Sequence, residues 1–195
     1  FAKEHVNKSA DEISIENFIK VVNFNKTEKD ERIGIVGGEP CLHSKFDEII
    51  NIIKNDDNIH DCVIFTNGIE LYNFADLFNH KKFLFLINCN SPQDIGEEKY
   101  KKLKKSILSL YKINKQFSLG VNLYSIEQDY SFIFDLLKIS NRHGIRFSLS
   151  IPNSIKEKEK DVFEVFKKFK PFLNNFFKEC FKHEIVPWND CNSIP

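Results

Sequence analysis

Short apolar segments alternate with amphipathic helical segments along almost the whole chain, and this alternation constrains the fold more than any other feature. The pattern predicts strands at 32–36, 62–65, 83–87, 117–124 and 146–151, and a short one at 185–186. Helical spacing predicts helices over 13–26, from 44 to beyond 53, and over 71–78, 97–114, 130–143 and 158–183. Repeated strand–helix pairs require parallel strands with helical crossovers, so the sequence predicts an α/β fold.

Local signals mark several helix ends. Ser14 is a plausible N-cap, and Ser44-Lys45-Phe46-Asp47 matches a capping box. Gly144 suits the position just after the helix over 130–143. Pro171 should kink the last helix or split it in two.

The strand pattern bears on which α/β architecture is present. An open doubly wound sheet and a (β/α) barrel both fit the rhythm of strands and helices. In 117–124 and 146–151, however, large apolar residues alternate with small or polar ones, whereas strands buried on both faces are apolar throughout. This favours an incomplete (β/α)6-type TIM barrel with outer helices and a polar cavity inside. An antiparallel sheet half in water is the alternative, and the intervening helices count against it.

Composition excludes several classes of function. The 195 residues carry zero formal net charge, which gives no general electrostatic grip on nucleic acid or anionic lipid, and the basic run at 99–105 is interpreted as a solvated helix face. No apolar run reaches the roughly 18 residues that span a bilayer. Residues 1–5 lack the apolar stretch of a signal peptide, so we expect a cytoplasmic protein. Five scattered cysteines argue against a disulfide framework or a CxxC metal site.

The expected carboxyl ends of the strands are polar or glycine-rich, and active sites of parallel α/β folds lie at such ends. These ends are residues 37–40 (GGEP), 66–68 (TNG), 88–91 (NCNS), 122–125 (NLYS) and 150–153 (SIPN). Gly37 and Gly38 permit close approach of a ligand to the backbone, and Glu39 adds a carboxylate that could bind an ammonium or hydroxyl group. An ordinary tight turn with an exposed Glu39 is an equally good interpretation from these residues alone.

These residues match a known pattern. Residues 33–40 (IGIVGGEP), followed by Leu42, His43 and an amphipathic helix, resemble the second-strand signature of radical S-adenosylmethionine (radical SAM) enzymes. Residues 63–68 (VIFTNG) are similar to the third strand of that family. The resemblance covers 1–153, and we expect a core domain over 1–183 and the start of a C-terminal extension or tail at 184–195.

The resemblance implies a partial barrel that binds S-adenosylmethionine and a [4Fe–4S] cluster. Reduction of the cofactor by a cellular one-electron reductant would yield a 5′-deoxyadenosyl radical that abstracts hydrogen from a small-molecule or peptide substrate. The family binds its cluster through a Cys-x-x-x-Cys-x-x-Cys loop after the first strand. This loop and strand are missing here, so they are expected before Phe1, and the chain as it stands would be inactive. Cys191 is a candidate ligand of an auxiliary cluster.

The resemblance also implies site residues. Gly37, Gly38 and Glu39 would hold the amino group of S-adenosylmethionine, with Pro40 shaping the turn, and Thr66 and Asn67 would line the floor beside it. The remaining candidates follow by position only: Asn88, Asn90, Asn122 and Ser125 for the ribose or carboxylate, and Ser150 with Pro152 for the adenine.

Other residues near these ends receive structural roles. Arg146 is expected to serve barrel packing or the substrate, His43 to fix the loop after Glu39, and Cys41 to be a buried structural thiol.

Two other functions remain open. A degenerate domain of this fold could bind a ligand without cluster chemistry. A Rossmann-like nucleotide-dependent transferase is disfavoured because no Gly-x-Gly-x-x-Gly turn is present.

Overall fold

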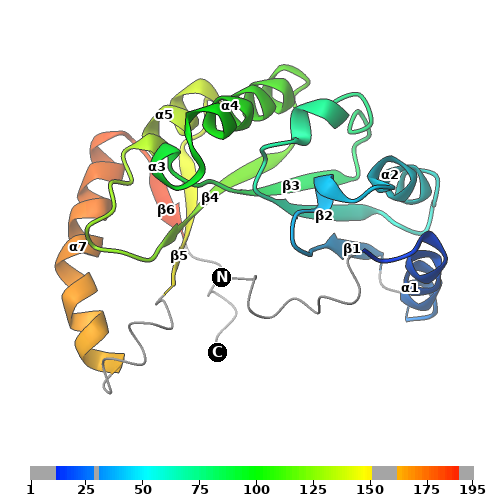
Figure 1. The fold of residues 1–195 in the computed structure, drawn as a ribbon, viewed down its shortest axis with the longest axis horizontal. Helices are drawn as coiled ribbons and strands as arrows, with labels where there is room; N and C mark the ends of the chain where they lie inside the picture. The colour runs from blue at the N-terminus through cyan, green and yellow to red at the C-terminus, as the bar shows by residue number, and fades with distance from the viewer. Residues whose placement is uncertain (1–11, 29–30, 151–161, 189–195) are drawn as a thin grey trace. The chain divides into compact units, whose positions relative to one another are not determined.

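The computed structural model describes residues 12–28, 31–150 and 162–188, without the side chains of residues 162 and 165. Six strands form one sheet whose order follows the sequence (Figure 1). They are β1 (Arg32–Ile35), β2 (Asp61–Thr66), β3 (Phe83–Asn88), β4 (Phe117–Leu123), β5 (Gly144–Leu149) and β6 (Val186–Trp188).

The predicted parallel α/β fold is confirmed. The pairings of β1 with β2, β2 with β3, β4 with β5, and β5 with β6 are all parallel. A doubly wound sheet reverses its strand order at a switch point, whereas this order runs from β1 to β6 without reversal. The sheet is therefore open and singly wound, as in an incomplete (β/α) barrel.

The chain divides into two compact units. The first comprises residues 1–87 and 101–117, and the second comprises residues 88–100 and 118–195. The helical elements are α1 (Ile15–Thr27), η2 (Pro40–Leu42), α2 (Phe46–Lys54), η3 (Leu71–Phe74), α3 (Pro92–Ile95), α4 (Glu97–Lys112), α5 (Phe132–Ile139) and α7 (Val162–Lys182).

Aromatic packing forms the centre of the first unit. The ring of Phe78 meets those of Phe46, Phe83 and Phe85 edge-on, with centroids 4.7–6.2 Å apart. α2 adds Ile50 and Ile53, because its apolar residues recur at helical spacing along one face. Each such buried side chain contributes about 1.5–3 kcal/mol, so this cluster holds the helices against β2 and β3.

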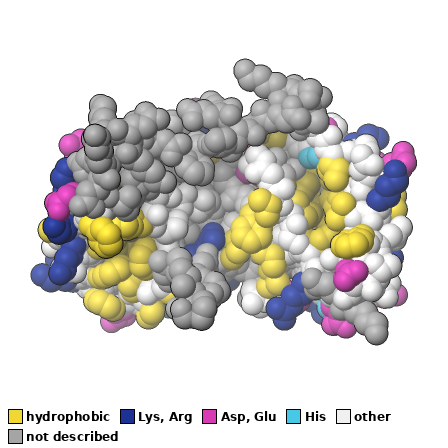
Figure 2. All heavy atoms as spheres, turned by 90° about the horizontal axis from the view of Figure 1, so that it is seen from below, with side chains coloured by type: hydrophobic (Ala, Val, Ile, Leu, Met, Phe, Trp, Pro, Cys, Tyr) yellow, Lys and Arg dark blue, Asp and Glu magenta, His cyan; other side chains and the backbone are white. Residues whose placement is uncertain are grey.

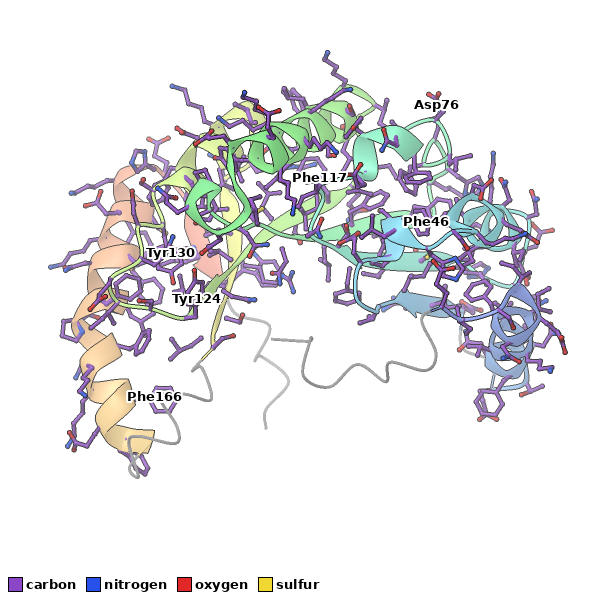
Figure 3. The ribbon with its side chains drawn as sticks, viewed as in Figure 1. Phe46, Asp76, Phe117, Tyr124, Tyr130 and Phe166 are labelled. Carbon is purple, nitrogen blue, oxygen red and sulfur yellow. The ribbon has the colours of Figure 1, made fainter. Side chains whose placement is uncertain are left out.

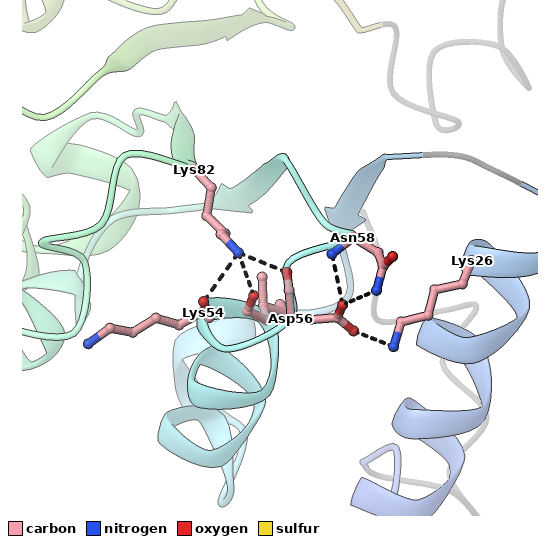
Figure 4. Close-up of polar contacts among 6 residues, drawn as sticks. Lys26, Lys54, Asp56, Asn58 and Lys82 are labelled. Atoms are coloured by element: carbon pink, nitrogen blue, oxygen red, sulfur yellow. Dashed lines mark hydrogen bonds and ion pairs between the residues drawn. The ribbon is translucent and has the colours of Figure 1, made fainter.

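A buried lysine closes the end of α2 in the same unit (Figure 4). The ammonium group of Lys82 donates to the carbonyl oxygens of Ile53, Lys54 and Asp56 at 3.0–3.2 Å. These carbonyls lie at the helix end, where no intrahelical donor is left for them. Burial alone would raise the pKa of Asp56, but its contacts with Lys26 and Asn58 outweigh burial and lower that pKa.

The second unit packs α7 against β5 and Tyr130. The ring of Tyr130 lies 5.5 Å from that of Phe172, and Phe147 of β5 lies 5.2 Å from Phe177. Figure 3 shows Tyr130 pointing toward α7. Because Phe147 contacts α7, its neighbours on either side in β5 face away from that helix.

Several end predictions are wrong. Lys45, not Ser44, is the N-cap of α2, because both polar groups of Ser44 bind Glu12 instead. α5 ends at Ile139, and Asn141 rather than Gly144 adopts the left-handed conformation, with φ of 49°. Asn is the usual substitute for glycine there. Gly144 opens β5.

Two helix predictions are also only partly right. The predicted helix over 71–78 is reduced to one turn, η3, although Leu71 and Phe78 still reach the core. α7 runs unbroken from Val162 to Lys182 through Pro171, so the predicted split does not occur. The Ser14 N-cap is confirmed, because its hydroxyl accepts from the Asn17 amide at 3.2 Å.

Large hydrophobic side chains remain exposed in both units, as the yellow areas of Figure 2 show. In the first unit they include Val21, Phe24 and Val36, and in the second Phe163 and Phe181. Within the described residues, no helix has the length and apolar character needed to cross a bilayer.

Candidate functional site

The turn after β1 carries the GGEP residues. Gly37 and Gly38 are exposed, and a Cβ atom on either would meet nothing within 4 Å. Glu39 then caps the 3-10 turn η2 by accepting a hydrogen bond from the Cys41 amide at 3.3 Å. Pro40 occupies the first position of that turn, where its missing N–H costs nothing. The backbone before Glu39 is thus open to solvent, whereas the backbone after it is fixed.

The Glu39 carboxylate joins the carboxyl ends of β1 and β2. Its Oε1 accepts from the Thr66 hydroxyl at 2.5 Å, and its Oε2 accepts from the Asn67 amide at 2.7 Å. Hydrogen bonds to an ionised acceptor are roughly twice as strong as neutral ones. The two sequence motifs are therefore direct partners of each other, and their polar side chains meet at one half-buried carboxylate.

The TNG residues each have a separate structural role. The Thr66 hydroxyl also accepts from the Gly68 amide at 3.0 Å, and the Asn67 side chain accepts from the Ile69 amide at 2.9 Å. Gly68 has φ of 74°, and a Cβ on it would approach Ile87 Cγ2 and Leu103 Cδ1 to 2.8 Å. Only glycine satisfies both the backbone conformation and the space at this position.

His43 and Glu12 tie the loop after η2 to the segment before α1. The Nε2 atom of His43 lies 2.9 Å from the Ile13 carbonyl, and its Nδ1 accepts from the Lys45 amide at 3.0 Å. The Glu12 carboxylate accepts from the hydroxyl and the amide of Ser44, which together lower the pKa of Glu12. His43 thus fixes this loop, as the sequence predicts.

A cavity of ≈ 480 Å³ lies beside β1 in the first unit. Gly37, Gly38, Glu39 and Pro40 line one part of it, and apolar side chains of α1, β1 and α2 line much of the rest. Thr66 and Asn67 are absent from its lining. The cavity therefore reaches the GGEP turn from the side of β1 and not from the side of β2.

The described thiols are buried. Burial raises the pKa of Cys41, and it raises the pKa values of Cys62 and Cys89 to about 12 and that of Cys180 to about 11. Such protonated thiols are poor nucleophiles at neutral pH. Across residues 12–28, 31–150 and 162–188 there is no group of three His, Cys, Asp or Glu residues that could hold a metal ion. Cys191 and Pro152 lie outside the described residues.

The position-based candidates of the second unit are dispersed among its loops. Asn88 ends β3 and is exposed, and Asn90 is half-buried before α3. Asn122 of β4 accepts a hydrogen bond from the Ser148 hydroxyl of β5. Ser125 and Ser150 follow β4 and β5, and the Ser150 amide donates to the Leu123 carbonyl at 2.9 Å. Each residue stands at or just past the carboxyl end of its strand, except Asn122, which is the penultimate residue of β4.

Sequence reasoning missed a polar network in this unit. Asp94 accepts from the Tyr124 hydroxyl at 2.6 Å and from the Ser91 hydroxyl at 2.8 Å. The Tyr130 hydroxyl accepts from the Tyr124 amide at 2.9 Å. Burial and the bond to Asp94 raise the pKa of Tyr124, so this hydroxyl stays protonated. Ser91-Pro92-Gln93-Asp94 fits the capping-box pattern, which could have identified Ser91 and Asp94. No comparable signal marks the tyrosines.

The arrangement in the first unit suits a small cationic ligand. A carboxylate held by three donors keeps acceptor capacity, because its two oxygens offer about four lone-pair sites. Beside it, Gly37 and Gly38 are exposed, and a Cβ atom on either would meet nothing within 4 Å. Such a site can hold and orient an ammonium group.

Comparison with known proteins identifies the fold. No family model matches the chain, and no curated protein sequence matches it. SuiB of Streptococcus suis matches in structures solved with S-adenosylmethionine (TM-score 0.62), with the precursor peptide SuiA (0.63), and as SuiB alone (0.59). Each match covers 90% of this chain at 11% identity. The likeness shows a shared α/β fold.

The chain spans less than half of the SuiB chain. It covers 43% of SuiB in the first of these structures and 42% in the other two. The shared part includes most of the present chain, and hence most of the strands and turns described above.

Proposed function

We propose that this chain forms the S-adenosylmethionine-binding part of a radical SAM enzyme. The observation that carries the proposal is the direct bonding of Glu39 to Thr66 and Asn67, which joins the two motifs of that family. The fold shared with SuiB, a protein that has been solved with S-adenosylmethionine, supports it independently.

The residues of the first unit fit the amino-acid part of S-adenosylmethionine. The ammonium group would bind at the backbone of Gly37 and Gly38 and at Glu39, while Pro40 keeps the turn in shape. Thr66 and Asn67 hold the Glu39 carboxylate in place, so they act on the ligand through Glu39. This refines the expectation that Thr66 and Asn67 only line the floor of the site.

The residues of the second unit would serve the rest of the cofactor. Asn88, Asn90, Asn122 and Ser125 remain candidates for the ribose or carboxylate, and Ser150 for the adenine. Of these, Asn122 is held by Ser148, and the Ser125 carbonyl and amide are held by the Tyr130 hydroxyl at 3.3 Å.

The described residues do not fit the [4Fe–4S] cluster. Among the described residues, no group of three His, Cys, Asp or Glu side chains could hold a metal ion. We propose that cluster cysteines belong to a part of the protein before Phe1, and that Cys191 ligates an auxiliary cluster if further cysteines accompany it. When bound, the cluster would supply the electron that cleaves S-adenosylmethionine. A cellular one-electron reductant would in turn reduce the cluster.

We propose a peptide as the substrate. SuiB has been solved with a precursor peptide, and the present chain shares its fold. Exposed apolar side chains in both units offer surface for a chain of this kind, although they also suit other parts of a longer protein.

A second function is favoured by one observation. Because no cluster ligands converge in the described residues, the fold could serve as a ligand-binding module without redox chemistry. The two functions predict different products from S-adenosylmethionine.

The test uses the full-length protein, reconstituted anaerobically with iron and sulfide. S-adenosylmethionine and dithionite are added, and 5′-deoxyadenosine is measured by mass spectrometry. The wild type and Glu48→Gln, a change of an exposed carboxylate on α2, should both form the nucleoside, whereas Glu39→Gln should form far less. A protein that binds no cluster and forms no nucleoside would leave the binding module as the better account.

A further inference from the structure

The second unit contains an arginine that lies flat on the sheet face turned away from α7. Phe147 of β5 contacts Phe176 and Phe177 of α7, so Arg146, the residue before it, points to the opposite face. Arg146 pairs in register with Gly120 of β4. A Cβ on Gly120 would lie 2.9 Å from Arg146 Nη2 and 3.2 Å from its Cζ, so the guanidinium lies directly over this glycine.

An aromatic ring lies next to Arg146 in the strand register. Trp188 of β6 pairs with Arg146, and its indole Nε1 lies 3.7 Å from the position of a Cβ on Gly144. The indole retains 38% of its exposure. Glycine inside a strand otherwise weakens it, and its presence often marks close approach of another group. Here Gly120 makes room for the guanidinium, whereas a Cβ on Gly144 would make only an ordinary van der Waals contact with Trp188.

One residue is charged among the described strands of this unit. Arg146 is the one Lys or Arg in the described strands β4, β5 and β6, and those strands contain no Asp or Glu. The hydroxyl of Ser148 and the amide of Asn122, which are bonded to each other, lie one layer nearer the carboxyl ends. A guanidinium has five N–H donors in a fixed fork, so it can bind a carboxylate bidentately while it keeps contacts within the protein.

We propose that Arg146, with Trp188 beside it, binds a carboxylate of the substrate, such as an acidic side chain of a peptide. This inference rests on the proposed function, because it assumes that the substrate enters this face of the barrel. A planar carboxylate matches the fork of a guanidinium through two parallel N–H···O bonds. The apolar carbons next to that carboxylate would pack on the indole of Trp188. Gly120 is the positioning residue, because any side chain there displaces the guanidinium.

The first test measures protection of Arg146 in the wild-type full-length protein. Phenylglyoxal modifies accessible arginines, and peptide mapping by mass spectrometry reports each site. Hexanoate should slow modification of Arg146 severalfold, while hexanamide, its neutral counterpart, should not. Arg32, which is exposed on β1, is the internal control, and phenylglyoxal should modify it at the same rate in hexanoate and in hexanamide. Equal modification of Arg146 with and without hexanoate would overturn the proposal.

Two variants test separately whether binding depends on the forked geometry of the Arg146 guanidinium and on its position over Gly120. Arg146→Lys keeps the positive charge without the fork, and hexanoate binding, followed by NMR titration, should weaken by about tenfold. Gly120→Ala keeps Arg146 but moves it, and hexanoate should then protect Arg146 less. Unchanged protection in Gly120→Ala would contradict the role of Gly120.

Titration with S-adenosylmethionine distinguishes this proposal from the proposed function. Arg146→Gln should bind S-adenosylmethionine as the wild type does. A loss of about tenfold would assign Arg146 to the cofactor carboxylate and overturn its role with the substrate. If the wild type binds no S-adenosylmethionine, the proposed function fails, while the hexanoate measurements still decide whether Arg146 binds a carboxylate.

Discussion

The loops at the strand ends of the two units are each held by a carboxylate, but the two carboxylates differ in burial. In the first unit Glu39, which is half-buried, accepts three hydrogen bonds from the turn after its own strand and from the end of β2. In the second unit Asp94, which is exposed, accepts from the hydroxyls of Tyr124 and Ser91, and the Tyr130 hydroxyl accepts from the Tyr124 amide. The first arrangement joins two sequence motifs. The second includes two tyrosines that no local pattern connects with their partners.

The residues around Glu39 could be predicted from the sequence, whereas the contacts of Tyr124 could not. The contacts of Glu39 run to residues within two compact motifs, GGEP and TNG. The contacts of Tyr124 span a similar distance in sequence, 30 positions against 27–28 for Glu39, but no motif marks Tyr124 itself. Thr66 is buried whereas Asp94 is exposed, and a buried polar group that loses its partner costs more than an exposed one, so substitutions in the first region should have larger effects.

The largest effect should come from the two left-handed glycines, one in each unit. Gly68→Ala combines backbone strain with contacts at 2.8 Å to Ile87 and Leu103. We expect it to lower the free energy of unfolding by roughly 2–5 kcal/mol. Gly96→Ala, with φ of 83° but open space around it, should cost only the strain, about 1–3 kcal/mol. Urea denaturation measures both, and equal losses would show that the packing around Gly68 yields freely.

Removal of the Glu39 carboxylate is the next largest effect. Glu39→Ala leaves the buried Thr66 hydroxyl and the Asn67 amide without their acceptor, so we expect a loss of about 2–3 kcal/mol in the free energy of unfolding. Glu39→Gln retains one oxygen and should lose less. The same denaturation experiment applies, with Glu48→Gln as the surface control. A Glu39→Ala protein as stable as the wild type would mean that the carboxylate does not join the two strand ends.

Loss of the Tyr124 hydroxyl should have a smaller effect. Tyr124→Phe keeps the ring against Tyr130 but removes the donor to Asp94, which keeps its bond from Ser91. We expect a loss of about 1 kcal/mol, because Asp94 is exposed and water can replace the lost donor. The melting temperatures of Tyr124→Phe and Glu39→Ala test the comparison directly. A larger decrease for Tyr124→Phe would reverse the ranking of the two regions.

The smallest effect concerns pH. The bonds from the Ser44 hydroxyl and amide lower the folded-state pKa of Glu12 below its ordinary value. Glu12 therefore contributes stability that is present above the unfolded-state pKa and is lost as the pH falls through the folded-state pKa. Glu12→Gln should slightly flatten the decline of stability in acid. Identical pH profiles for variant and wild type, measured by thermal unfolding, would show that this contact does not form in solution.

The fold could be predicted largely from periodicity. The buried residues of α2 and the alternation in β4 follow directly from helical and strand spacing, so both elements appear where expected. Helix ends were harder, because they depend on partners distant in sequence. Ser44 fits the N-cap pattern in the sequence, but its hydroxyl binds Glu12, which lies 32 residues earlier, instead of capping α2. Likewise, Gly144 looks like a helix end, yet Asn141 takes that conformation and Gly144 lies beneath Trp188.

The candidate site also contains residues that could be predicted from the sequence and residues that could not. Glu39, Thr66 and Asn67 were predicted from their motifs, and the structure brings them into direct contact. Their mutual bonding could not be predicted, because the sequence does not show that Glu39 faces the end of β2. Asp94, Tyr124 and the position of Arg146 over Gly120 depend on strand register, which a single sequence does not reveal.

The most direct test of the central claim is the affinity for S-adenosylmethionine. Calorimetric titration of the full-length wild type, Glu39→Gln and the control Glu48→Gln would measure it without any dependence on redox chemistry. The account predicts that wild type and control bind alike and that Glu39→Gln binds at least about tenfold more weakly, because the fixed carboxylate holds the ammonium group. Equal affinity in all three proteins, or no binding by the wild type, would contradict it.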